Sequence, residues 1–142
     1  MRFLVTGGSG FIGSNYVLKQ IQAGKNTVLN LDKLTYAGNK HYIKNIINSP
    51  RVNFVKGDIN NYYSYTKLLK KVDLAINIAA ESHVDRSIEG PAEFIQTNVV
   101  GTLNLLEQSR LFYQHSNSDN FRFLHVSTDE VYGSLGEHGK FQ

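Results

Sequence analysis

A glycine cluster near the start of the chain constrains the fold more than any other stretch. It reads Thr6-Gly7-Gly8-Ser9-Gly10-Phe11-Ile12-Gly13, follows the apolar run 3–5 and precedes apolar residues at helical spacing up to Ile21. This order predicts a strand, a tight turn and a helix. The glycines permit the turn, a close approach of the backbone to a pyrophosphate, and close packing of the helix on the strand. The N–H groups of the helix N-terminus would then face the phosphates.

A second apolar run, residues 28–31, ends at Asp32, about 20 residues beyond the glycine cluster. An acidic residue at this distance is suited to bind the two hydroxyls of a ribose, so the region predicts a dinucleotide site. Asp32 favours NAD over NADP, because a carboxylate repels a 2′-phosphate, although the adjacent Lys33 could soften that repulsion. The alternative is a set of glycines that only serves turns. The predicted phosphate-side residues are Gly7, Gly10, Phe11, Ile12 and Gly13.

Composition excludes several other classes of protein. The 142 residues, 41% of them hydrophobic, suit one domain with a core, and a net charge of +3 spread along the chain argues against nucleic-acid binding. The absence of cysteine excludes disulfides and thiolate sites, and the five histidines show no metal-ligand spacing, so we predict no metal. Without a signal peptide or a long apolar span, we expect a cytoplasmic protein with no membrane partner.

Further strands are predicted at 52–55, 74–78 and 121–126, alternating with helices at 41–48, 62–72 and 91–114. Alternating strands and helices predict an α/β fold with a doubly wound parallel sheet of five strands in the order 3-2-1-4-5. The broad apolar face of the last helix would serve either the core or a dimer.

Several residues follow directly after the third and fourth predicted strands, at the edge where open parallel sheets bind ligands. Asp58 could accept a hydrogen bond from an adenine amino group, or it could simply stabilise a turn. The small residues Ala79 and Ala80 would let a bulky cofactor lie against the backbone.

These motifs resemble the extended short-chain dehydrogenase/reductases that act on nucleotide sugars, and the resemblance covers all 142 residues. The stretch 81–87 and the triplet Thr128-Asp129-Glu130 narrow it to the branch that dehydrates nucleotide-activated glucose, with dTDP-glucose as the expected substrate. The resemblance implies NAD as the cofactor and a homodimer as the assembly. It also places Ile59, Glu81 and Thr97 at the cofactor and Ser82 at the substrate.

The same resemblance assigns roles to the triplet, whose three residues would all contact the substrate. Asp129 would be the acid, Glu130 the base, and Thr128 would hydrogen-bond the carbon 4 hydroxyl. Oxidation at carbon 4 acidifies the hydrogen on carbon 5, so a base can remove it while an acid protonates the departing carbon 6 hydroxyl. Two adjacent carboxyl groups can divide these roles if their environments differ. Alternatively, they only begin a helix after the strand.

The chain departs from the family in one respect. The family oxidises through a tyrosine activated by a lysine four residues later, beyond the fifth strand, whereas Tyr36 with Lys40 and Tyr63 with Lys67 have this spacing at other places. The resemblance therefore implies that residues 1–142 are the NAD-binding domain of a longer enzyme, incomplete without its substrate domain and inactive alone. A nucleotide-sugar epimerase or decarboxylase and a non-catalytic NAD-binding module stay open, as does the choice between thymidine and uridine.

Overall fold

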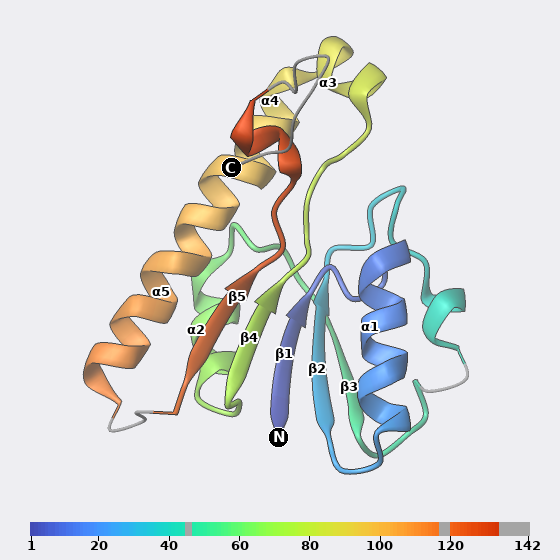
Figure 1. Ribbon diagram of the computed structural model, residues 1–142, viewed down its shortest axis with the longest axis vertical. Helices are drawn as coiled ribbons and strands as arrows, with labels where there is room; N and C mark the ends of the chain where they lie inside the picture. Colours follow the sequence, from blue (N-terminus) through green and yellow to red (C-terminus); the bar gives the residue numbers. More distant parts are fainter. Residues whose placement is uncertain (45–46, 117–119, 134–142) are drawn as a thin grey trace.

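Five short strands form one parallel sheet in the computed structural model, which describes residues 1–44, 47–116 and 120–133. The strands are β1 (Arg2–Thr6), β2 (Thr27–Asp32), β3 (Val52–Lys56), β4 (Leu74–Asn77) and β5 (Arg122–His125). Their order is β3-β2-β1-β4-β5 (Figure 1), which confirms the predicted doubly wound topology. The connection from β1 runs to β2, on one side of β1, whereas the connection from β3 runs to β4, on the other side. The two connections therefore diverge at the carboxyl ends of β1 and β4.

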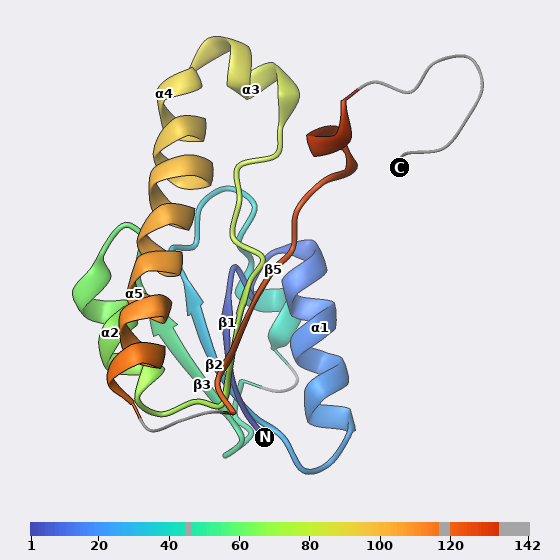
Figure 2. The same ribbon diagram turned by 60° about the vertical axis from the view of Figure 1, so that its left-hand side comes forward.

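Helices cover both faces of the sheet (Figure 2). The helix α1 (Phe11–Gln22) and the 3₁₀ turn η1 (Lys40–Ile43) lie on one face, and α2 (Tyr62–Leu69) and α5 (Thr102–His115) lie on the other. The short helix α3 (Val84–Glu89) follows β4, and the 3₁₀ turn η3 (Asp129–Tyr132) follows β5. In the part of the chain that the structure describes, no helix combines the length and the apolar character needed to cross a membrane.

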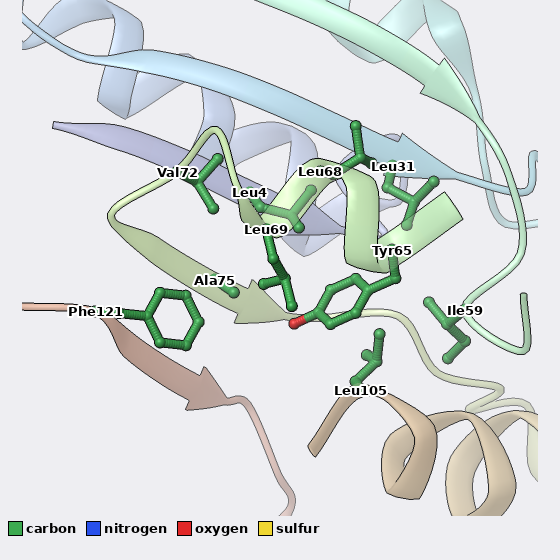
Figure 3. Close-up of a cluster of buried hydrophobic side chains, with 10 residues drawn as sticks. All are labelled: Leu4, Leu31, Ile59, Tyr65, Leu68, Leu69, Val72, Ala75, Leu105 and Phe121. Atoms are coloured by element: carbon green, nitrogen blue, oxygen red, sulfur yellow. The ribbon is translucent and has the colours of Figure 1, made fainter. Parts of the chain in front are cut away.

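Two hydrophobic cores lie on the two faces of the sheet. Leu4 of β1 belongs to the core under α2 and α5, whereas Phe3 and Val5 belong to the core under α1. This division follows from the two-residue period of a strand and explains why β1 is apolar on both faces. Figure 3 shows the first core, in which Tyr65 is fully buried and its hydroxyl hydrogen-bonds Ser109 Oγ at 2.8 Å. Burial raises the pKa of Tyr65, so its hydroxyl stays neutral.

The predicted helix over 91–114 is continuous, but its middle is wound differently. It consists of α4 (Pro91–Phe94), the π-helical η2 (Ile95–Gly101) and α5. Gly101 is buried there, and a Cβ on it would lie 2.6 Å from Ile59 Cδ1. Leu105 of α5 is buried in the core and Phe112 packs against it, whereas Val99 and Leu103 of the predicted apolar face are 56% and 64% exposed. Core packing within the described residues therefore accounts for Phe112 but not for Val99 and Leu103.

The predicted helix over 41–48 is wrong for the residues of it that the structure describes, 41–44 and 47–48. These contain the 3₁₀ turn η1, begun by the Asn39 side chain, which accepts the His41 N–H at 2.8 Å, and then turns. The Ser49 hydroxyl accepts the Arg51 N–H at 3.3 Å, and the Ser49 carbonyl oxygen accepts the Val52 N–H at 3.0 Å. Local side-chain bonds such as that of Ser49 compete with helical pairing, and Pro50 disfavours helix at the residue before it.

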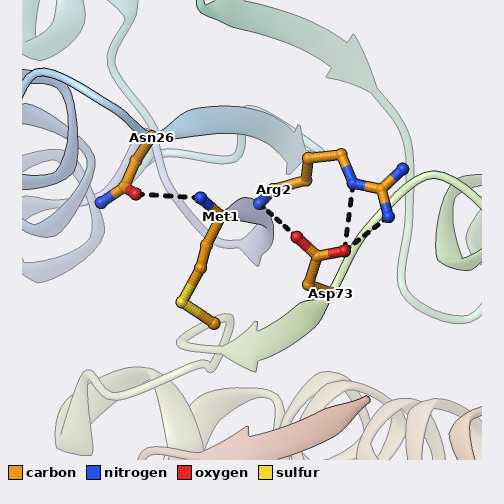
Figure 4. Close-up of polar contacts among 4 residues, drawn as sticks. All are labelled: Met1, Arg2, Asn26 and Asp73. Carbon is orange, nitrogen blue, oxygen red and sulfur yellow. Dashed lines mark hydrogen bonds and ion pairs between the residues drawn. The ribbon is translucent and has the colours of Figure 1, made fainter. Parts of the chain in front are cut away.

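Polar contacts join the segments at the amino edge of the sheet (Figure 4). Asp73 accepts the backbone N–H of Arg2 at 2.8 Å and its guanidinium Nε at 3.1 Å, and the Met1 ammonium donates to Asn26 Oδ1 at 3.2 Å. These bonds tie the start of β1 to the turns before β2 and β4. The candidate site lies at the opposite, carboxyl edge.

Candidate functional site

A cleft opens at the carboxyl edge of the sheet, between the segments that leave β1, β2, β3 and β4; it encloses about 610 Å³ when the space open to solvent is included. The structure brings most of the predicted cofactor residues together around it, namely Gly7, Gly10, Asp32, Lys33, Asp58, Ile59, Ala79, Ala80, Glu81 and Thr97. The other residues that line the cleft were not among the predicted cofactor residues: Leu31, Thr35, Ala37, Gly38, Gly57 and Ile78.

Two glycines of the cluster are required by the packing of the protein itself. Gly7 has φ +72°, and a Cβ on it would lie 2.6 Å from the backbone nitrogen of Ala79. The turns after β1 and β4 therefore touch through their backbones. Gly13 is buried in α1, where a Cβ would collide with the Gly7 carbonyl oxygen and lie 2.7 Å from Gly8 Cα. Gly13 thus allows α1 to begin directly against the turn.

Gly10 has no such reason to be glycine. Its backbone is extended, with φ −77° and ψ 177°, and a Cβ would meet nothing closer than the Gly7 carbonyl oxygen at 3.4 Å. Because Gly10 lines the cleft, its missing side chain leaves room for a ligand at the N-terminus of α1. No side chain caps this helix, so the N–H groups of its first turn are open to an anion.

Phe11 and Ile12 begin α1 beside Gly10 but do not line the cleft. Their side chains are 75% and 62% exposed. Only their backbone N–H groups can therefore take part in the predicted phosphate site, as can that of Gly13 at the same helix N-terminus.

Asp32 ends β2 at the floor of the cleft and is only 8% exposed. Its Oδ2 accepts the Ser9 N–H at 2.8 Å, and its Oδ1 accepts the Leu34 N–H at 2.7 Å. These two donors fix the orientation of the carboxylate, and each oxygen keeps a further lone pair for a ligand hydroxyl.

Lys33 and Asp58 form an ion pair on the wall of the cleft, with Nζ and Oδ2 2.8 Å apart. Asp58 also accepts the backbone N–H of Asn60 at 2.9 Å, so the predicted turn role is present. Burial by itself would raise the pKa of Asp58, but the hydrogen bonds from Lys33 and Asn60 outweigh it and hold that pKa below its ordinary value. The same hydrogen bond raises the pKa of Lys33. Both groups are therefore charged at neutral pH.

The segment after β4 forms the other wall and is held by Asn98 of η2. Asn98 Oδ1 accepts the Glu81 N–H, and its Nδ2 donates to the Glu81 carbonyl oxygen, both at 2.8 Å. Thr97, next to Asn98, lines the cleft. The sequence did not predict the positioning role of Asn98, because this role depends on how η2 packs against the segment after β4. Glu81 Oε2 is buried and accepts no hydrogen bond from the described residues.

The candidate catalytic triplet lies at the same edge of the sheet, beyond the lining of the cleft. Thr128 is the N-cap of η3, so the predicted alternative of a helical start is also present. Its Oγ1 accepts the Glu130 N–H at 3.3 Å and donates to Asp129 Oδ1 at 3.3 Å. All three residues are exposed.

Ser82 and His83 lie between the cleft and α3, and both are exposed. His83, and not Ser82, is the N-cap residue of α3. The His83 ring packs edge-on against Tyr36, with centroids 5.9 Å apart. Within the described residues, no group of three or more His, Asp or Glu side chains could hold a metal ion.

Known proteins similar to this chain include dTDP-glucose 4,6-dehydratases and a UDP-glucose 4-epimerase. A curated dTDP-glucose 4,6-dehydratase of Xanthomonas campestris pv. campestris is 56% identical over 144 residues, which cover 98% of this chain and 41% of the relative. The crystal structure of a dTDP-glucose 4,6-dehydratase from Streptomyces venezuelae with NAD bound matches with a TM-score of 0.84 and 44% identity, over 99% of this chain and 43% of that one.

A UDP-glucose 4-epimerase of Thermus thermophilus in complex with NAD matches with a TM-score of 0.79 and 28% identity, over 100% of this chain and 42% of that one. The chain thus spans about two fifths of the length of the relatives it matches. The family model described as GDP-mannose 4,6 dehydratase matches residues 4–141. On this match the chain belongs to the GDP-mannose 4,6 dehydratase family.

Proposed function

We propose that the protein dehydrates a nucleotide-activated glucose with NAD as cofactor, converting dTDP-glucose to dTDP-4-keto-6-deoxyglucose. Residues 1–142 would be the NAD-binding domain of that enzyme and supply part of its catalytic site. One observation carries the proposal: the carboxyl groups of Asp129 and Glu130 stand beside Thr128 at the same sheet edge as the cleft. The dehydratases among the relatives support it.

The cleft fits NAD by shape and by donors and acceptors. Room beside Gly10 and the open N-terminus of α1 suit the pyrophosphate. Asp32 would accept from both hydroxyls of the adenine ribose, and Asp58 and Ile59 would contact the adenine. Ala79, Ala80, Glu81 and Thr97 form the wall on the nicotinamide side, where the unpaired Glu81 Oε2 can accept from a ligand hydroxyl.

The triplet would then act on the sugar. NAD would supply the hydride acceptor for carbon 4 and, once reduced, the hydride donor for carbon 6. The tyrosine through which the family oxidises would take the carbon 4 hydroxyl proton, and Glu130 would return a proton to carbon 5 as the hydride reaches carbon 6. Thr128 Oγ1 would hydrogen-bond the carbon 4 hydroxyl and orient it, and Glu130 would remove the proton from carbon 5. Asp129 would protonate the departing carbon 6 hydroxyl, so one water leaves. The hydrogen bond from Thr128 to Asp129 holds the acid beside the group that orients the sugar.

The residues favour a dehydratase over an epimerase of similar fold. An epimerase removes no water, so it needs no acid for a leaving hydroxyl, and the paired carboxyl groups would have no task. We also propose that the protein forms a homodimer. The exposed apolar residues of η2 and α5, among them Val99, Leu103 and Leu106, support this because they are not covered by the described residues.

The test is Asp129→Asn in the protein that carries this chain, supplied with NAD and dTDP-glucose, with products followed by mass. We expect reduction of NAD to continue and loss of water to fall by about 100-fold or more, the usual contribution of a general acid. Glu89→Gln, which changes an exposed carboxylate of α3, is the matched control and should behave as wild type.

Three outcomes would contradict the proposal. Unimpaired loss of water in Asp129→Asn would refute the acid role. A wild-type product of unchanged mass and altered stereochemistry would indicate an epimerase. A wild-type protein that binds NAD and forms no product would indicate a binding module.

A further inference from the structure

The Tyr36 side chain links the two walls of the cleft. It lies in the loop 33–39 that follows β2 and that lines one wall through Thr35, Ala37 and Gly38. The opposite wall is the segment after β4, including Ala80 and Glu81. Tyr36 makes its contacts with that opposite segment.

Two side chains pack against the Tyr36 ring. The Arg86 guanidinium carbon lies 3.9 Å from the centroid of the Tyr36 ring, and the His83 ring packs against it edge-on at 5.9 Å. Burial first and the nearby Glu81 carboxylate second raise the pKa of Tyr36, so its hydroxyl stays neutral. A cation on the ring face and an aromatic ring at its edge are both favourable contacts for tyrosine.

The loop is held in a shape that projects Tyr36 toward these partners. Leu34 has φ +58°, the only positive value of a non-glycine residue in the described part of the chain. Such a value is strained for a bulky side chain and persists only where the surroundings impose it. Asp32 imposes it by accepting the Leu34 N–H at 2.7 Å, and the Asn39 N–H donates to the Ser9 carbonyl oxygen at 2.8 Å. Both ends of the loop are thus tied to the cofactor side of the cleft.

The partner segment is also fixed. Asn98 holds the Glu81 backbone through two hydrogen bonds of 2.8 Å, and Arg86 lies 3.9 Å from the Glu93 carboxylate. Two positioned segments therefore meet through the Tyr36 side chain, and substituting Tyr36 leaves the hydrogen bonds that anchor each segment in place.

We propose that Tyr36 is a positioning residue that closes the cleft over the bound dinucleotide and slows its release. The inference rests on the proposed function. In that reaction the hydride taken from carbon 4 must be given to carbon 6 of the same sugar, so the reduced cofactor has to stay bound until the water has left. A cofactor that escapes midway leaves an oxidised sugar and no reductant to complete the cycle.

The experiment measures NAD release directly, by stopped-flow displacement from the protein that carries this chain. Tyr36→Ala should release NAD about tenfold faster or more, from the loss of the cation and ring-edge contacts together. Tyr36→Phe keeps the ring contacts with Arg86 and His83 and should give a smaller increase. Tyr42→Ala is the matched control, because Tyr42 and Tyr36 are both 47% exposed and Tyr42 lies in η1, outside the loop 33–39 that lines the cleft.

A second measurement follows dTDP-glucose turnover and the free reduced cofactor that appears with an oxidised, undehydrated sugar. This abortive product should increase in Tyr36→Ala and stay at the wild-type level in Tyr42→Ala. An unchanged release rate in Tyr36→Ala, with or without altered turnover, would overturn the inference. If the wild type binds NAD but does not dehydrate the sugar, the proposed function fails, whereas the release rates still decide whether Tyr36 retains the cofactor.

Discussion

Replacing Gly10 by alanine separates the binding of a phosphate from the folding of the glycine turn. The methyl group would stand in the cleft, 3.4 Å from the Gly7 carbonyl oxygen, and Gly10 already has backbone angles that alanine adopts. The matched variant is Gly13→Ala, in which the same methyl group would stand against the Gly7 carbonyl oxygen and 2.7 Å from Gly8 Cα. Each variant adds one methyl group, at positions three residues apart in the glycine cluster.

The structure gives opposite expectations for the two variants. For Gly10→Ala, the reduced entropy of the unfolded chain stabilises by about 0.4–1 kcal/mol, and the weaker N-cap preference of alanine offsets it, so the net change is about zero. For Gly13→Ala, overpacking against backbone costs about 1–3 kcal/mol or more, since no side chain can turn aside. In the cleft, the Gly10→Ala methyl group would displace the pyrophosphate at a similar cost, about 5- to 150-fold in the NAD dissociation constant.

Thermal unfolding without NAD and calorimetric titration with NAD measure the two effects. For a domain of this size, about 1 kcal/mol corresponds to roughly 3 °C in the melting temperature. We expect Gly10→Ala to melt within about 2 °C of wild type and to bind NAD weakly, and Gly13→Ala to melt several degrees lower. If Gly10→Ala binds NAD as tightly as wild type, the phosphate does not lie at this turn. If it melts as low as Gly13→Ala, the reasoning from the space around Gly10 is wrong.

Two further predictions concern ion pairs. Asp58→Asn frees Lys33, which is held 2.8 Å from Asp58 in the wild type, to pair with a 2′-phosphate, so the preference for NAD over NADP should fall by about tenfold. The ratio of the NAD and NADP dissociation constants measures this preference. An unchanged ratio would show that Lys33 does not reach the 2′-phosphate. The pKa of Asp73 is held below 3.8 by the Arg2 guanidinium first and the Arg2 N–H second, so this carboxylate stabilises the fold at neutral pH and the stabilisation is lost as pH falls through the folded-state pKa. Asp73→Asn should therefore be less stable than wild type in urea at pH 7, and the difference should shrink below about pH 4; a difference independent of pH would contradict the assignment.

The sheet and the cofactor cleft were predictable because their signals are local. Each strand is a short apolar run, and the crossover rule converts the alternation of strands and helices into the order β3-β2-β1-β4-β5. Asp32 could be placed because it directly ends such an apolar run, and its side chain lines the cleft. Gly7 and Gly13 could be placed because only a residue without a side chain fits where two backbones touch.

The features that were missed depend on packing between distant segments. Asn98 acts on Glu81 across 17 residues, and nothing at either position announces the pair. Tyr36 meets Arg86 because the loops after β2 and β4 face each other across the cleft, although β1 separates the two strands in the sheet. The error over 41–48 has a different cause, since the turn around Ser49, whose hydroxyl accepts the Arg51 N–H, and Pro50 after it disfavour a helix there.

The cofactor half and the catalytic half of the candidate site differ in how firmly their side chains are held. This difference separates the effects of substitutions on NAD binding from their effects on turnover. Asp32 is 8% exposed and oriented by two backbone donors, so the cofactor half is preorganised before any ligand arrives. Thr128, Asp129 and Glu130 are exposed, and the hydrogen bond from Thr128 Oγ1 to Asp129 Oδ1, at 3.3 Å, is longer than the bonds of 2.8 and 2.7 Å that orient Asp32, so the catalytic half is less firmly held. A division of roles requires different environments, and a bound sugar that excludes water from one carboxyl group can supply them. Substitutions at Asp129 or Glu130 should therefore change turnover and leave NAD affinity unaltered, whereas Gly10→Ala should change NAD affinity first.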